Sequence, residues 1–228
     1  IFPITIKYWI NTFMSIKTLI LWKLIKKHVG RLGKMLLESL KKTLESEAQK
    51  IYKKNKSQII DIILFGSIIK GKEKPKDVDI IIIFKDKNNL DISYELRKSL
   101  EKNIKIPIEV NSKIYSELFE TNFQAREAIL VEGYSLLNKI NLADGFGFKS
   151  MAMFMYKLIN KTKSERMRFY YSLYGRNTEG ILKKLKAIKY TDTIILVPIE
   201  NKETMKEYLN NWNIEFKETS LLLPVRLI

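Results

Sequence analysis

The stretch DIILFGSIIKGKEKPKDVDIIIIFKD, residues 61–86, begins and ends as a buried β-strand, but its middle carries glycines, lysines and two closely spaced aspartates. Side chains at positions i and i+2 of a strand point to the same face, so Asp77 and Asp79 are expected to project together. Two anions this close repel each other. The pattern therefore predicts a positive charge between them.

The segments around this stretch predict a small α/β unit. Residues 58–65 and 77–84 are short, Ile-rich runs, as in strands buried on both faces. We expect a helix over 35–55, these two strands, a helix over 91–102, a strand over 104–110, and helices over 113–120 and 124–132. This order predicts a mixed sheet covered by helices.

A change of composition at residues 138–150, with paired glycines and no periodicity, predicts a connector. After it we expect helices over 148–160 and 163–175, a basic turn over 175–180, a short helix over 181–188, and a strand, a helix and a strand over 193–223. The layout is an N-terminal helical extension (1–34), a central domain (35–143) and a smaller basic C-terminal domain (144–228), helical or α+β.

Composition indicates a globular chain that favours an anionic partner. Its 228 residues are 46% hydrophobic, which fits one or two small domains. A net charge of +16 favours a polyanion, with nucleic acid first among the candidates. The alternative is a Lys-rich surface without a partner, as in a thermophile or a chain from an AT-rich genome.

The lack of cysteine and the single histidine limit the kinds of catalytic and metal site that the chain can form. The chain has no cysteine, which excludes disulfides, thiolate metal sites and thiol nucleophiles and fits a reducing cytoplasm. It has one histidine, His28, so no His-based catalytic or zinc site can form within the chain. Any catalysis is therefore expected from carboxylates.

Residues 1–34 differ from the rest of the chain, with six Lys, one Arg and no acid. No uncharged run approaches the roughly 20 residues that a membrane-spanning helix needs. Three interpretations stay open: a basic amphipathic helix on a membrane or nucleic acid, a helix packed on the domain, or an extension absent from the mature protein. Met14 and Met35 are alternative starts, and we favour the second and third interpretations.

The opening stretch also predicts a phosphate and metal site. Gly66 allows close approach of a ligand to the backbone, and the amides after it can cradle a phosphate. Two carboxylates on one strand face suit a hard divalent ion such as Mg²⁺, which is held by few protein ligands together with substrate phosphates. In the strand expected over 104–110, Glu109 faces away from the isoleucines and is the candidate third carboxylate.

These residues resemble the nucleotidyltransferase superfamily that includes DNA polymerase beta, CCA-adding enzymes and minimal nucleotidyltransferases. The matching pattern is a strand, Gly66-Ser67, about ten residues, and then Asp77-Val78-Asp79 opening a strand. The resemblance covers roughly residues 35–140, and a weaker one to uncharacterised archaeal nucleotidyltransferases covers the C-terminal part. It identifies residues 35–143 as a nucleotidyltransferase domain with a mixed sheet and flanking helices.

The resemblance implies a metal-dependent enzyme that moves a nucleoside monophosphate from an NTP such as ATP to an acceptor hydroxyl and releases pyrophosphate. Gly66, Ser67 and Lys70 would bind the nucleotide, and three carboxylates would hold two Mg²⁺ or Mn²⁺ ions. Those carboxylates would be Asp77, Asp79 and Glu109, although the family more often has Asp at the third position.

The C-terminal part interleaves basic and aromatic residues over 156–176. Such mixtures can hold phosphates and stack on bases, or the rings can form the core of this domain and the basic residues its solvated face. Arg176, in a glycine-rich turn, is the candidate for a phosphate contact.

Two functions of different class follow. The first is an active transferase whose acceptor is an RNA or DNA end, a protein hydroxyl or a small-molecule alcohol. The second is a nucleic-acid-binding or partner-binding module on a nucleotidyltransferase scaffold with weak or absent catalysis. The intact Gly-Ser and Asp-x-Asp motifs favour the enzyme.

Overall fold

The structure, a computed structural model, describes residues 16–72 and 74–227, with side chains from residue 35 onward. Residues up to Lys41 and residues from Lys42 onward form two units. Helix α2 (Ile16–Lys54) begins in the first unit and ends in the second. Of the predicted extension, residues 1–15 lie outside the described residues and the remainder is helical backbone of α2. The division into three domains stays a prediction.

The last turns of α2 pack into the second unit. Leu44, Ala48 and Ile51 recur at helical spacing and are buried. The helix ends at Lys54, as the sequence predicts, and the Asn55 side-chain amide donates to the Ile51 carbonyl at 3.0 Å. This end of α2 is therefore fixed by apolar burial and by a local hydrogen bond.

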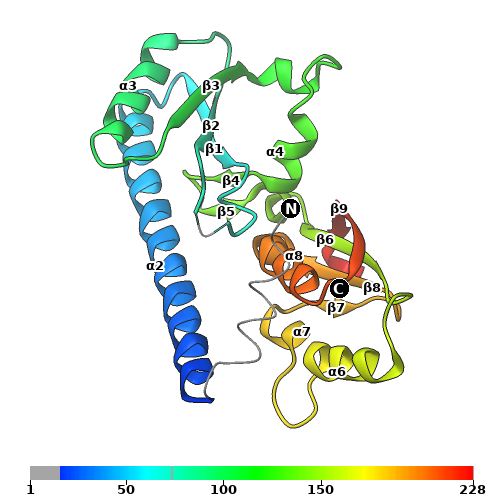
Figure 1. The fold of residues 1–228 in the computed structure, drawn as a ribbon. Coiled ribbons are helices and arrows are strands. Elements are labelled where there is room, and N and C mark those ends of the chain that lie inside the picture. The colour runs from blue at the N-terminus through cyan, green and yellow to red at the C-terminus, as the bar shows by residue number, and fades with distance from the viewer. Residues whose placement is uncertain (1–15, 73, 228) are drawn as a thin grey trace, which may run out of the picture. The chain divides into compact units, whose positions relative to one another are not determined.

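The first sheet of the second unit contains the predicted strand pair (Figure 1). Its strands are β1 (Ile59–Phe65), β2 (Val78–Phe84), β3 (Ile108–Ile114), β4 (Tyr134–Ser135) and β5 (Ile140–Asn141), in the spatial order β3-β2-β1-β4-β5. β2 and β3 are parallel and are connected through helix α3 (Leu90–Glu101), whereas the other neighbours are antiparallel. The sheet is therefore mixed, as predicted.

One face of this sheet carries an apolar cluster that ends at a carboxylate. On one face, Ile63, Ile81 and Ile83 form a buried cluster with Ile129 of helix α4 (Arg126–Glu132). Because side chains alternate along a strand, Asp79 shares this face with Ile81 and Ile83. The apolar cluster therefore ends at a carboxylate.

The second sheet lies in the C-terminal part of the chain and is entirely antiparallel (Figure 1). Its strands are β6 (Phe148–Lys157), β7 (Ile188–Lys189), β8 (Ile194–Pro198) and β9 (Glu215–Pro224), in the order β7-β8-β6-β9. The helices of this part are α5 (Leu142–Gly145), α6 (Lys163–Tyr174), α7 (Ile181–Lys184) and α8 (Lys202–Asn211). The described residues also form the 3-10 helices η1 (Tyr115–Phe119), η2 (Ile199–Asn201) and η3 (Val225–Leu227).

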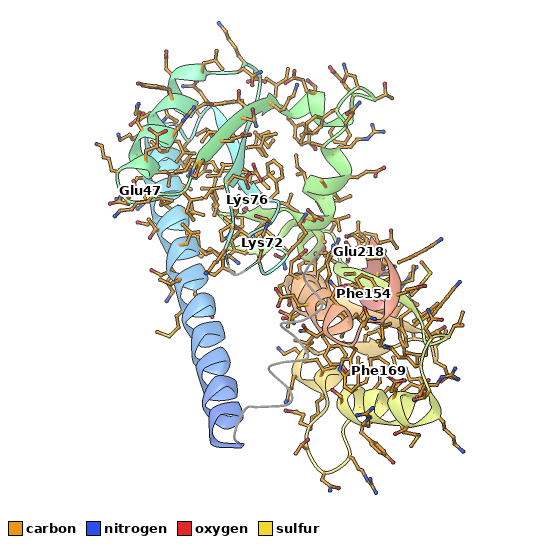
Figure 2. The ribbon with its side chains drawn as sticks, in the orientation of Figure 1. Glu47, Lys72, Lys76, Phe154, Phe169 and Glu218 are labelled. Carbon is orange, nitrogen blue, oxygen red and sulfur yellow. The ribbon has the colours of Figure 1, made fainter. Side chains whose placement is uncertain are left out.

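Aromatic side chains fill the core beside the second sheet. The Phe169 ring lies 5.6 Å from the Tyr156 ring and 5.7 Å from the Trp212 ring, and Phe154 lies 5.6 Å from Phe216. Figure 2 labels Phe154 and Phe169 in this layer. Of the two interpretations of these aromatic residues, burial favours the core for Phe169 and Tyr156, which are each 1% exposed.

The prediction of a helix over 148–160 is wrong. Residues 148–157 form β6, which pairs with β8 on one side and with all ten residues of β9 on the other. Met and Ala favour helices, but the gain from hydrogen bonding on both edges outweighs that preference. Burial alternates along its second half, as expected of a strand.

Smaller corrections concern element boundaries. The strand expected over 104–110 is β3, which begins at Ile108 and extends to Ile114. The helix expected over 113–120 is replaced by the end of β3 and the 3-10 helix η1, and the expected connector contains β5 and α5. The short helix expected over 181–188 ends at Lys184.

The fold class is confirmed as mixed α+β, with helices flanking a mixed sheet. In the described part of the chain, no helix is both long and apolar enough to cross a membrane.

The buried strand β2 gives a direct test of this core. Ile82 is fully buried between β1 and β3, whereas Ile60 on β1 is 39% exposed. Ile82→Ala should lower the free energy of unfolding by about 2–5 kcal/mol, because it removes buried methyl groups and leaves a cavity. Ile60→Ala, the control with the same chemical change, should cost much less. Chemical denaturation measures both, and equal losses would contradict this core.

Candidate active site

A tight turn follows β1 and fixes the first part of the site. Gly66 and Gly71 both have left-handed backbone conformations, with φ of +83° and +80°. Between them, Ile68 and Ile69 are buried, and their burial fixes the turn against the core. The Lys72 amide closes it by donating to the Ser67 carbonyl at 3.2 Å. The predicted Gly-Ser segment is therefore a closely folded turn that begins with a residue lacking a side chain.

The carboxylate of Asp79 lies directly against this turn. Phe65 and Asp79 are partners in the antiparallel β1–β2 register, which brings the strand entry beside Gly66. A Cβ atom built on Gly66 would lie only 2.5 Å from the Asp79 Oδ2 atom. A glycine is therefore needed here both for its positive φ and for the space that the carboxylate occupies.

Glu109 lies next to Asp79 on the neighbouring strand. The two residues are partners in the parallel β2–β3 register, so their side chains share one face of the sheet. Asp77 directly precedes β2. The sequence thus correctly places Glu109 on a strand beside the Asp-x-Asp segment, although that strand begins later than expected.

The pKa of Asp79 reflects its burial and the charges of the residues around it. Burial raises the pKa of the Asp79 carboxyl above its usual range, and the negative charges of Asp77 and Glu109 raise it further. The positive charge of Lys70 acts in the opposite direction and lowers it. The expected positive charge near the aspartates is therefore supplied in part by Lys70.

These carboxylates suit a divalent cation in their chemistry. They offer hard oxygen ligands, and their mutual repulsion is the interaction that a bound cation would relieve. Among the residues that the structure describes, no three acidic or imidazole groups converge closely enough to hold an ion by themselves. Mg²⁺ is commonly held by one or two carboxylates together with substrate phosphates, so the donor set fits that ion.

The hydroxyl of Ser67 is a further feature of the turn. Its Oγ atom is buried and has no hydrogen-bond partner within the described ranges. Buried polar atoms are normally hydrogen-bonded, because an unpaired one loses the free energy of its contact with water. A phosphate oxygen bound at the turn would provide the missing acceptor.

Lys70 is held by a residue that the sequence analysis missed. Its Nζ atom lies 3.0 Å from the Glu132 Oε2 atom, and Glu132, the last residue of α4, is almost fully buried. The ion pair ties α4 to the turn. The signal was present in the segment ILVEGYSLL at residues 129–137, where an acid interrupts an apolar run.

The C-terminal part of the chain also braces the turn. The Glu203 amide donates to the Lys70 carbonyl at 3.4 Å, and Gly71 packs against the backbone of Glu200 in η2. A Cβ atom on Gly71 would clash with the Glu200 carbonyl oxygen. No local sequence pattern indicates these contacts, because Glu200 and Glu203 lie far along the chain.

Basic residues continue from the turn toward Asp77, and one predicted residue lies elsewhere. Lysines occupy alternate positions from Lys70 to Lys76, and Figure 2 labels Lys72 and Lys76 in this loop. Arg176 instead follows α6, where its guanidinium carbon lies 4.8 Å from the centre of the Tyr171 ring. The predicted phosphate contact of Arg176 stays a prediction.

Comparison with known proteins identifies the part of the chain that carries this geometry. Residues 46–139 match the family model described as "Polymerase beta, Nucleotidyltransferase". A solved structure titled "Crystal structure of the toxin-antitoxin with AMP-PNP" is 20% identical, covers 40% of this chain and 71% of its own, and has a TM-score of 0.32. No curated protein matches. The family match confirms the resemblance that the Gly-Ser and Asp-x-Asp motifs predict.

The brace between Gly71 and Glu200 can be isolated by two matched substitutions. Gly147 also has a positive φ, of +77°, but a Cβ atom there would meet nothing within 4 Å. Gly147→Ala should therefore cost only the left-handed backbone strain of about 1–2 kcal/mol. Gly71→Ala should lower the free energy of unfolding by more, because it adds the clash with Glu200. Denaturant titration compares them, and equal costs would contradict the brace.

The carboxylate repulsion predicts a pH-dependent gain of stability. Because folding raises the pKa of Asp79, its ionisation destabilises the native state, and this cost is present above the raised pKa and vanishes below the usual Asp range near 3.8. Asp79→Asn should therefore raise the melting temperature at neutral pH, and the gain should shrink toward pH 4. Thermal melts across this range measure it.

Asp192→Asn is the control for that experiment. A hydrogen bond from Lys189 lowers the pKa of Asp192, so the same chemical change should not stabilise the protein at neutral pH. A neutral or negative shift for Asp79→Asn at neutral pH would contradict the proposed repulsion.

Proposed function

Because residues 46–139 belong to the nucleotidyltransferase superfamily, we propose that the protein transfers a nucleoside monophosphate from an NTP to an acceptor hydroxyl. The observation that carries this proposal is the packing of the Asp79 carboxylate against Gly66, with Glu109 beside it. That arrangement sets acidic groups next to a turn whose buried Ser67 hydroxyl lacks a partner among the described residues.

In this proposal the turn binds the triphosphate. Gly66 lets the phosphates approach the backbone, and the Ser67 hydroxyl donates to a phosphate oxygen. Lys70 supplies positive charge, and its ion pair with Glu132 holds the ammonium group near Asp79 rather than in solvent. These three residues bind and orient the nucleotide.

The carboxylates would hold the metal ions. Asp77, Asp79 and Glu109 would hold Mg²⁺ or Mn²⁺, and the family resemblance implies two such ions. The bound ions would stabilise the negative charge on the attacking and leaving oxygens. The acceptor oxygen bonds to the α-phosphorus, and the bond from that phosphorus to the bridging oxygen breaks. Pyrophosphate leaves with the electron pair, and the hydroxyl proton passes to water.

Such a reaction requires positioning and charge more than protein acid–base groups, so it is compatible with a chain that has a single histidine. The acceptor classes that fit are an RNA or DNA end and a protein hydroxyl. The strongly positive net charge favours a nucleic acid.

One observation favours the alternative, a binding module with weak or absent catalysis. Within the described ranges, the three carboxylates do not converge on a common point, and Glu109 is exposed. In this alternative the turn still binds a nucleotide, but no transfer follows.

A transfer assay separates the two functions. The full chain is incubated with each of the four radiolabelled NTPs, Mg²⁺ or Mn²⁺, and RNA, DNA and protein acceptors. We expect label transfer by the wild type and a loss of about a hundredfold or more in Asp77→Ala and Asp79→Ala, because each removes charge that stabilises the transition state.

Asp86→Ala is the matched control, since Asp86 is an exposed aspartate just after β2. It should retain wild-type transfer. Nucleotide binding without transfer in the wild type would favour the binding module, and transfer that survives Asp79→Ala would overturn the proposed site.

A further inference from the structure

Helix α6 presents large apolar and aromatic side chains to solvent. Its buried side carries Phe169 and Leu173, yet Met167, Tyr171 and Tyr174 are 42%, 39% and 39% exposed. The solvent-facing side of a surface helix is normally polar. An exposed aromatic stripe on a helix that already has a buried side indicates an interaction surface.

Cations lie over the exposed rings. The Arg176 guanidinium carbon is 4.8 Å from the centre of the Tyr171 ring, and the Lys189 Nζ atom is 5.5 Å from that of Tyr174. The Tyr170 and Tyr174 rings are stacked, with centres 5.9 Å apart and an angle of 23° between their planes. Aromatic faces and positive charge therefore occur together.

The segment around α6 carries half of the net charge of the protein. Residues 157–190 contain ten Lys and Arg and two Glu, a net +8 of the total +16. Lys183 and Lys189 are partly neutralised by ion pairs with Glu179 and Asp192. In the described part of the chain, no carboxylate is ion-paired with Lys163, Arg168 or Arg176, which keeps this surface strongly positive.

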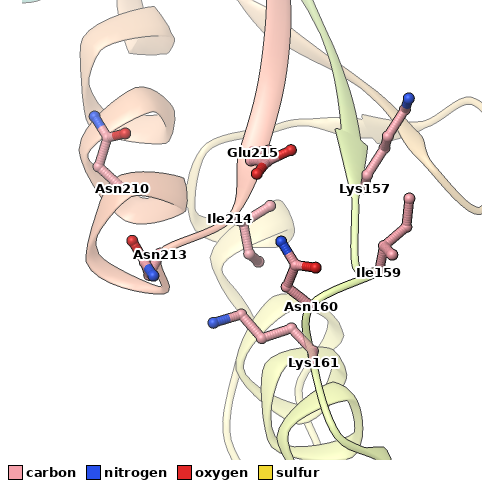
Figure 3. A pocket seen from close by; sticks show the side chains of 8 residues that line it. All are labelled: Lys157, Ile159, Asn160, Lys161, Asn210, Asn213, Ile214 and Glu215. Carbon is pink, nitrogen blue, oxygen red and sulfur yellow. The ribbon is translucent and has the colours of Figure 1, made fainter.

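The positive character continues beyond the amino end of α6. A cavity of about 180 Å³ opens between the end of β6 and the start of β9 (Figure 3). Lys157 and Lys161 line it together with Asn160, Asn210, Asn213 and Glu215. Polar groups able to contact phosphate or sugar therefore also lie just before the amino end of α6.

We propose that this α6 surface, made of Lys163, Met167, Arg168, Tyr171, Tyr174 and Arg176, binds single-stranded RNA. An unpaired base can stack on the exposed Tyr171 ring while the arginines contact phosphates, whereas a duplex hides the faces of its bases. The exposed hydroxyls of Ser164 and Thr178 are suited to the 2′-hydroxyl that distinguishes RNA from DNA. That this RNA is also the acceptor rests on the proposed function, but its binding does not.

The test measures binding of a short labelled single-stranded RNA to the full chain by fluorescence anisotropy, without NTP or divalent metal, over a range of salt concentrations. Tyr171→Ala should weaken binding by about tenfold, because it removes a stacking partner, and Tyr171→Phe should retain it. Arg168→Gln should reduce the slope of log K against log salt by about 0.7, since it removes one phosphate contact.

Matched controls come from α3, where Tyr94 is 61% exposed and Lys98 lies over its ring. Tyr94→Ala and Lys98→Gln should leave both affinity and salt slope unchanged. Asp79→Asn should bind RNA as the wild type does, so a failure of the transferase proposal is seen separately from a failure of this one.

Three results would overturn the assignment. Equal weakening by Tyr94→Ala and Tyr171→Ala would mean that α6 has no special role. Duplex RNA that binds as tightly as the single strand would mean that charge alone holds it, and single-stranded DNA that binds as tightly would contradict the choice of RNA.

Discussion

The site depends on the register of two antiparallel strands. Phe65 is paired with Asp79, and that pairing brings the Asp79 carboxylate against Gly66. A slip of one residue would turn every side chain of β2 to the opposite face of the sheet and would direct this carboxylate among buried isoleucines. Since an unpaired buried charge is costly, the aspartate itself disfavours the wrong register of an otherwise uniform apolar strand. The residue proposed for chemistry thus also helps to specify the fold.

The arrangement of carboxylates proposed for function lowers the stability of the fold. Asp77, Asp79 and Glu109 repel one another, and this repulsion and burial both raise the pKa of Asp79. The buried isoleucines of β1 and β2 and the Lys70–Glu132 ion pair hold these groups together despite that cost. A violation of simple packing rules that the surrounding structure compensates is typical of a functional site. A divalent cation would relieve this repulsion, because its positive charge would offset the negative charges of the carboxylates.

The sequence predicts the local parts of this site but not its supports. The glycine turn, the Asp-x-Asp strand and Glu109 are readable because each depends on near neighbours and on alternation along a strand. Residues 148–157 are misread as helix because Met and Ala favour helices, whereas the hydrogen bonds of β6 to β8 and β9 come from residues far along the chain. Glu200 and Glu203 are missed for the same reason, since their contacts with the turn carry no local pattern. Glu132 interrupts an apolar run, but that pattern does not identify Lys70 as its partner.

These long-range contacts connect the C-terminal part of the chain to the proposed nucleotide site. The sequence predicts a separate C-terminal domain over residues 144–228, yet Glu200 and Glu203 contact the turn that we propose binds the nucleotide. Both lie where β8 passes into α8, and Tyr208 of α8 and Trp212 just after it pack around Phe169 of α6. A continuous series of packed residues therefore connects the proposed nucleotide turn to the helix proposed to bind RNA.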